Sequence, residues 1–232
     1  MLRNTWNTLS SHPIHFFLLQ IPLGVIPLLD EALPQDSSQT LFKVVMALLV
    51  FFPLFVGCSV VAIAATFQSV LRSIDHLPLS FFLSYKATFS RFSKLFPASL
   101  IAMGLALLGF PTIVLLIYFS AIYLFVPHFV MLDGSCSWSV YLARSKNLVK
   151  TRFWVVILVA IFLLLLEPLL MIGGHYLGGL LPGLSSFAPL QDCLQYLLKG
   201  FLSMVAGLMV NVALSHFFLH LRTGQSHEIN SQ

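Results

Sequence analysis

The chain has 232 residues, of which 58% are hydrophobic and only 9% are charged, with a formal net charge of +4. Soluble domains carry about 25% charged residues, so a water-soluble fold is excluded and the bilayer must be the solvent of this chain. The three cysteines lie far apart, without metal-ligand spacing or the pattern of a disulfide framework. We expect no cofactor and no nucleic-acid partner.

The first two expected membrane spans differ in quality. Residues 14–29 form a short apolar segment that contains Pro22 and Pro27, which a membrane helix tolerates when neighbours satisfy the freed carbonyls. No small-x-small cleavage site follows, so we expect a span, tilted or partly interfacial, rather than a signal peptide. Residues 44–66 contain no charged residue and exceed the ~20 residues needed to cross ~30 Å of hydrocarbon.

Residues 95–132 form the longest stretch without a charged residue. One helix of this length would measure ~57 Å, nearly twice the hydrocarbon thickness. The run Gly109-Phe110-Pro111 is the natural break, because Gly ends helices and Pro begins them. We therefore expect a membrane hairpin of two spans, 95–110 and 111–132.

Residues 153–172 and 194–221 are the fifth and sixth expected spans. Residues 1–222 would then form a single polytopic membrane domain. The polar tail, residues 223–232, is expected to be disordered.

Two polar stretches between spans have the pattern of amphipathic helices at a membrane surface. In segment 68–94, an aromatic stripe lies opposite a basic face and continues just beyond the segment. It consists of Phe81, Phe82, Tyr85, Phe89, Phe92 and Phe96. After the expected turn at Asp133-Gly134, helical spacing places a second set on one face, namely Trp138, Tyr141, Leu142, Ser145, Leu148 and Val149. The predicted fold is an all-α membrane protein with about six transmembrane helices and two cytoplasmic interfacial amphipathic helices.

The two amphipathic segments can be aligned by pairing Tyr85 with Tyr141, and Lys94 then meets Lys150. Both units run from a span through a basic helix to a returning span, which favours a parallel internal repeat of residues 44–110 and 111–173. Interfacial composition alone could produce the same matches, and the sequence leaves both explanations open.

The basic residues predict the orientation. With a cytoplasmic N-terminus and six spans, every Lys and Arg lies inside except Lys43 and Lys199. We therefore expect a multi-pass protein of the cell (inner) membrane whose N- and C-termini are both cytoplasmic.

A series of short motifs runs from residue 129 to residue 154. It consists of FVMLDG at 129–134, Ala143-Arg144-Ser145, Leu148, and Arg152-Phe153-Trp154 at the start of a span. Together these residues resemble the membrane domain of glycerophosphodiester phosphodiesterases and related uncharacterised bacterial polytopic proteins. In the phosphodiesterases this region precedes a soluble catalytic barrel. The chain continues for only ten residues after Arg222, so we expect no barrel here. The resemblance implies a fold, and it carries over no catalytic residue.

Glu167 is the ionisable residue expected deepest in a span, about 21 Å from the cytoplasmic end by helical rise. Such a group is a functional-site hypothesis by default. Its expected partner is Lys199, and Asn211 or Gln20 could share a proton or cation site with it. A purely structural ion pair is the alternative interpretation.

Two further groups of residues could bind ligands. His216 and His220 lie four residues apart on one helix face, but HxxxH needs further ligands to hold zinc, and we predict no metal. The basic helices are expected to contact anionic lipid headgroups through Lys86, Arg91, Lys94, Arg144, Lys146, Lys150 and Arg152. The alternative is that these residues only determine topology.

No Ser-His-Asp, paired-carboxylate or Rossmann pattern is present, so we predict that the protein is not an enzyme. The favoured hypothesis is an integral membrane protein that organises or senses lipid, or scaffolds a membrane-protein partner, at the cytoplasmic face. The alternative hypothesis is a small transporter or channel subunit that uses Glu167 within the helix bundle.

Overall fold

The computed structural model describes residues 2–24, 50, 52–107, 113–159, 161–162, 165 and 188–230. Within these ranges the chain is helical and contains no strand, so the predicted all-α class is confirmed. The helices are α1 (Leu2–Ser11), α2 (Pro13–Leu18), α3 (Ile21–Gly24), α6 (Phe52–Ile74), α7 (Phe81–Ser90), α8 (Phe92–Leu107), α9 (Ile113–Tyr123), α10 (Val126–Leu132), α11 (Trp138–Thr151) and α13 (Ala188–Asn230).

Three helical stretches in the described part of the chain are long and apolar enough to cross a membrane. They are Phe52–Ile74, Val114–Leu132 and Met204–Thr223. These stretches indicate a membrane-embedded protein. Of the expected fifth span, 153–172, residues 160, 163–164 and 166–172 lie outside the described residues.

The helix of the second span ends later than the sequence predicts. The sequence predicts that it stops at Thr66, but α6 continues as far as Ile74. The helix stops only near Asp75 and His76, where His76 has a φ of 54°, followed by Pro78. The change in polarity after residue 66 therefore does not end the helix, because Gln and Arg are good helix formers.

Both ends of the chain also differ from the expected pattern. The described part of the first expected span is not one helix: α2 and α3 are separated by a turn at Leu19–Gln20. At the other end, α13 continues to Asn230, through residues for which the sequence predicts a disordered tail. A helix that is already formed propagates into a polar segment at little cost.

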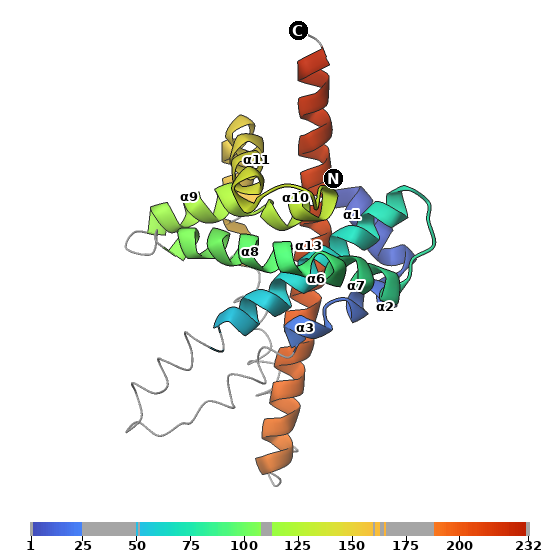
Figure 1. Ribbon diagram of the computed structural model, residues 1–232. Coiled ribbons are helices and arrows are strands. Elements are labelled where there is room, and N and C mark those ends of the chain that lie inside the picture. Colours follow the sequence, from blue (N-terminus) through green and yellow to red (C-terminus); the bar gives the residue numbers. More distant parts are fainter. Residues whose placement is uncertain are drawn as a thin grey trace.

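The expected hairpin is present as α8 and α9, which lie side by side (Figure 1); the turn between them lies outside the described residues. The second arm is itself broken at Leu124–Phe125 into α9 and α10. Pro127 near the start of α10 has no N–H to continue the helical hydrogen bonding. This break was not predicted, and it sets α10 against α6 and α8.

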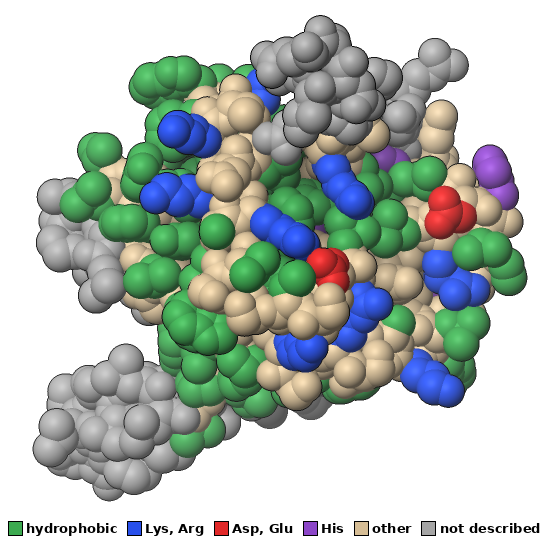
Figure 2. Space-filling model, turned by 45° about the horizontal axis from the view of Figure 1, so that its top comes forward, with side chains coloured by type: hydrophobic (Ala, Val, Ile, Leu, Met, Phe, Trp, Pro, Cys, Tyr) green, Lys and Arg blue, Asp and Glu red, His purple; other side chains and the backbone are tan. Residues whose placement is uncertain are grey.

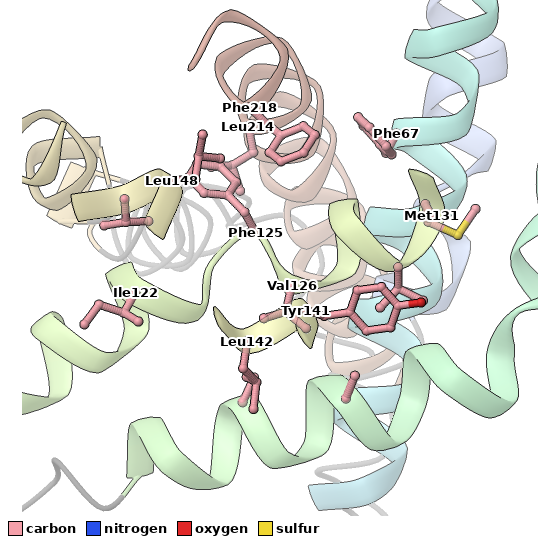
Figure 3. Close-up of a cluster of buried hydrophobic side chains, with 14 of the residues drawn as sticks. Phe67, Ile122, Phe125, Val126, Met131, Tyr141, Leu142, Leu148, Leu214 and Phe218 are labelled. Carbon is pink, nitrogen blue, oxygen red and sulfur yellow. The ribbon is translucent and has the colours of Figure 1, made fainter. Parts of the chain in front are cut away.

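The helices pack around two clusters of buried apolar side chains, and the larger cluster is the main core. The longest helix, α13, runs through the centre of the molecule, and α6 packs against it (Figure 1). Phe67 of α6, Phe125, Phe218 of α13 and Tyr141 of α11 are all fully buried in this core (Figure 3). The core therefore ties α11, which the sequence places at the membrane surface, to the spanning helices.

Helix α7 exposes two of its aromatic side chains and buries two of its hydroxyl groups. Phe82 and Phe89 are 81% and 59% exposed, whereas Ser84 and Thr88 are buried. The Ser84 hydroxyl lies 2.7 Å from that of Ser69 in α6. A helix with polar groups facing the protein and aromatic rings facing outward fits a lipid environment. Lipid chains cannot hydrogen-bond to hydroxyl groups, whereas aromatic rings make favourable contacts with them.

The burial pattern gives no support to the proposed repeat register. Ser84 and Thr88 are buried, but their counterparts Val140 and Arg144 are exposed when Tyr85 is paired with Tyr141. In this register the two basic helices bury different faces. The internal repeat stays a prediction.

Candidate functional site

The candidate site is the short turn 133–137 between α10 and α11, together with the basic side chains around it. The Asp133 carboxylate accepts hydrogen bonds from the Ser135 hydroxyl at 2.5 Å and the Ser135 N–H at 3.3 Å. The Cys136 thiol donates to it at 3.2 Å, and Arg144 donates at 2.9 Å. These hydrogen bonds connect Asp133 at the start of the turn to residues within the turn and to α11.

Asp133 is held ionised by its neighbours. The Ser135 hydroxyl, then the Arg144 guanidinium and the Cys136 thiol, lower the pKa of the Asp133 carboxyl well below its usual range. The carboxylate is thus an acceptor in the turn and not a proton donor near neutral pH. Its ion pair with Arg144 is solvent-exposed, with side chains 38% and 43% accessible.

The Tyr141 hydroxyl bridges the two ends of the same turn. It donates to the Asp133 carbonyl oxygen and accepts from the Cys136 N–H at 3.1 Å. The residue is fully buried, and burial raises the pKa of the phenol, which keeps it a donor. The first turn of α11 is therefore attached to the end of α10.

Two basic side chains reach this turn from the α7–α8 junction, about 40 residues earlier in the chain. Arg91 donates to the carbonyl oxygen of Met131 and, at 3.4 Å, to that of Val130, while Lys94 donates to that of Gly134. A Cβ on Gly134 would lie 3.2 Å from the Arg91 side chain, so the approach is close. Arg91 thus donates to carbonyl groups that the end of α10 leaves unpaired, and Lys94 donates to a carbonyl of the turn that follows.

The other four predicted lipid contacts do not bond to the backbone or to the side chains of the described residues. Within the part of the chain that the structure describes, they are exposed and form no hydrogen bond or ion pair. They are Lys86, Lys146, Lys150 and Arg152. Lys and Arg side chains gather on one face of the molecule, with few acidic side chains among them (Figure 2). The seven predicted residues are therefore of two kinds, engaged and free.

The predicted apolar face of α11 is buried against the protein. Tyr141, Leu142, Leu148 and Val149 are all buried, whereas Trp138 is 50% exposed. Helices α8, α9 and α10 cover this face, so it does not lie on lipid. The exposed side of α11 carries the free lysines.

Ser145, the one polar residue of that face, has a clear structural role. Its hydroxyl donates to the Ile122 carbonyl oxygen at 2.6 Å. This carbonyl belongs to the last turn of α9, where the helix leaves acceptors without a partner. Ser145 therefore connects α11 to the break between α9 and α10.

The intramembrane candidates are only partly described. Glu167 lies outside the described residues, as does the side chain of Lys199. Asn211 is buried in α13, and its amide donates to Gln20 at 2.9 Å. Gln20 in turn donates to the Thr66 hydroxyl at 2.7 Å. Asn211 and Gln20, which the sequence grouped together, thus form a polar contact between α13, the α2–α3 turn and α6.

The histidines do not gather into a metal site in the described residues, where no group of three or more potential ligands is found. His216 lies 3.1 Å from the Thr8 hydroxyl, and His220 is exposed. His128 is fully buried and packs against Phe67, Phe125 and Phe218.

The sequence interpretation missed the roles of Asp133, Arg91 and Tyr141. One signal for Asp133 was available, because it is the only acidic residue between Asp75 and Glu167. A lone carboxylate beside a basic helix is a candidate partner for one of the basic residues. Comparison with family models, curated proteins and solved structures gives no match.

Proposed function

We propose that the chain is a multi-pass integral membrane protein without catalytic activity, which gathers anionic lipid around its basic face. The observation that supports this is the division of the basic residues. Arg91, Lys94 and Arg144 bond to the protein itself, and the free cations have no protein partner in the described residues. Unpaired cations beside apolar helices need an anionic counterpart, and lipid headgroups supply it.

Among the seven predicted lipid contacts, the free cations are Lys86, Lys146, Lys150 and Arg152, and their number limits the strength of the interaction. Each Lys or Arg near an anionic surface contributes about 1 kcal/mol, so four contribute on the order of 4 kcal/mol if they act independently. That is enough to enrich anionic lipid locally. It is not a tight, saturating interaction.

The exposed tryptophans indicate the level of the membrane surface. Trp138 and Trp154 are 50% and 76% exposed, and they flank α11 at its two ends. Tryptophan is enriched at the membrane–water interface. We propose that α11 lies at this level in the cell membrane, on the cytoplasmic side, with six spans and both termini cytoplasmic. A membrane-protein partner could be scaffolded at the same face.

The test uses tryptophan fluorescence in bilayers that contain brominated lipid. The protein has three tryptophans, and the Trp6→Phe variant leaves only Trp138 and Trp154, beside the basic helix. Quenching by brominated phosphatidylglycerol is compared with quenching by brominated phosphatidylcholine at equal mole fraction. We expect stronger quenching by the anionic lipid, and a loss of this preference at about 1 M salt, where the Debye length falls to about 3 Å.

The matched control retains charge. Replacing Lys86, Lys146 and Lys150 by Arg leaves every cation in place, so the preference for the anionic lipid should persist. Equal quenching of the parent protein by the two lipids at low salt would overturn the proposed function.

A further inference from the structure

A cavity of about 370 Å³ lies beside the exposed side of α11. It is lined by Tyr118, Ile122, Lys146, Val149, Lys150 and Phe153. The lining comes from α9, α11 and the segment that starts directly after α11. Pockets for small molecules span about 300–1,000 Å³, so this one is large enough for a single headgroup and the first part of a chain.

One wall of the cavity is cationic. Lys146 and Lys150 are four residues apart on α11 and therefore lie on the same helix face. Neither has a hydrogen bond or ion pair with another described residue. The Asp133 carboxylate, which forms the one ion pair in the described residues, is bonded to Arg144 and not to either lysine. Two full positive charges also outweigh the partial charge of about −0.5 at the end of a helix, so the wall attracts an anion.

The other wall is apolar and aromatic. The rings of Tyr118 and Phe153 pack edge to face with centroids 5.4 Å apart. Ile122 is 5% exposed and Val149 is fully buried, so both form a closed floor. Tyr118 and Ile122 belong to the stretch Val114–Leu132, which is apolar enough to cross a membrane. This wall therefore continues into the region where acyl chains lie.

We propose that this cavity binds one anionic phospholipid, with its phosphate between Lys146 and Lys150 and its first methylene groups on Tyr118 and Phe153. The inference rests on the proposed function and deepens it, because it assigns a defined position to one of the lipids. Free inorganic phosphate would use only the cationic wall. The apolar wall is the reason to assign a phospholipid rather than a soluble phosphate.

The test is native mass spectrometry of the full chain in detergent, titrated separately with phosphatidylglycerol, phosphatidylcholine, glycerol phosphate and inorganic phosphate. We expect one phosphatidylglycerol to bind in preference to the other three compounds. The Lys146→Gln/Lys150→Gln variant should bind it at least about tenfold more weakly, which corresponds to about 1.4 kcal/mol. Its melting temperature should be unchanged, because neither lysine forms a hydrogen bond or ion pair with another described residue.

The matched control is Lys86→Gln/Arg152→Gln, which removes the same number of charges outside the cavity. We expect it to bind phosphatidylglycerol as the parent protein does. An equal loss of binding in both variants would overturn the assigned cavity while leaving general anionic enrichment in place. Equally tight binding of glycerol phosphate would overturn the assignment to a phospholipid. No preference of the parent protein for phosphatidylglycerol over phosphatidylcholine would overturn both this inference and the proposed function.

Discussion

The guanidinium of Arg144 donates to the carboxylate of Asp133 at 2.9 Å, which forms the one ion pair in the described part of the chain. The pair spans the turn between α10 and α11. It engages the only acidic residue between Asp75 and Glu167. As a result, the lysines on the exposed side of α11 have no acidic neighbour along this stretch of sequence, and they stay available to lipid.

Replacing Asp133 by Asn should lower the melting temperature slightly and increase the preference for anionic lipid, because Arg144 is released. The lowered pKa of Asp133 gives the pH dependence. Its stabilising contribution is fully present above the ordinary pKa of 3.8 and is lost as the pH falls below that value towards the folded-state pKa. The difference in melting temperature between the two proteins should therefore be constant from about pH 7 to 5 and shrink below about pH 4. A difference that disappears already at pH 6 would contradict this role of the carboxylate.

Replacing Arg91 by Gln should destabilise the protein, because two carbonyl oxygens at the end of α10 lose a charged donor. Hydrogen bonds to charged groups contribute about 1.5–3 kcal/mol, and we expect the lower end because Arg91 is only half-buried. Thermal unfolding in detergent measures the change. Lys86→Gln is the control and should unfold at the parent temperature. The engaged role of Arg91 would be wrong if both variants behaved alike.

Replacing Ser145 by Ala should also destabilise the protein, since the Ile122 carbonyl would be buried without its donor. The expected loss is about 1–3 kcal/mol. Ser139, an exposed serine of the same helix, provides the control, because Ser139→Ala removes no buried partner. Equal unfolding curves for Ser145→Ala and the parent protein would show that the 2.6 Å contact contributes nothing to stability.

The contact between Gln20 and Asn211 should show coupling in a double-mutant cycle. Each single change to Leu leaves the other amide buried and without its partner, whereas the double change removes both. Cycles for polar contacts in membrane proteins average about 0.6 kcal/mol, with a maximum near 1.7 kcal/mol. We expect a coupling energy within this range from unfolding measurements. Additive single changes would show that the two side chains act separately.

Local periodicity predicted the parts of the fold that depend on one helix face. The spacing of Tyr141, Leu142, Leu148 and Val149 predicted one apolar face on a helix at the membrane surface, and the structure buries all four side chains in the core. The same reasoning could not identify what covers that face. Periodicity shows that a helix is amphipathic. It does not distinguish lipid from protein as the partner of the apolar face.

The roles of Arg91 and Lys94 were beyond sequence reasoning for a related reason. Their acceptors are backbone carbonyls about 40 residues away, and every residue has such a carbonyl. A contact between a side chain and a distant backbone carbonyl therefore cannot be predicted from composition or residue spacing. Charge alone predicted a surface position, which is correct for the free cations and incomplete for the engaged ones.

The most direct test of the central claim is the quenching ratio of brominated phosphatidylglycerol to brominated phosphatidylcholine in the quadruple Gln variant of the free cations. These are Lys86, Lys146, Lys150 and Arg152. We predict that the ratio falls to about one while the melting temperature stays at the parent value, because these side chains contact lipid and not protein. An unchanged ratio in a folded variant would contradict the account, since the lipid preference would then not depend on the free cations.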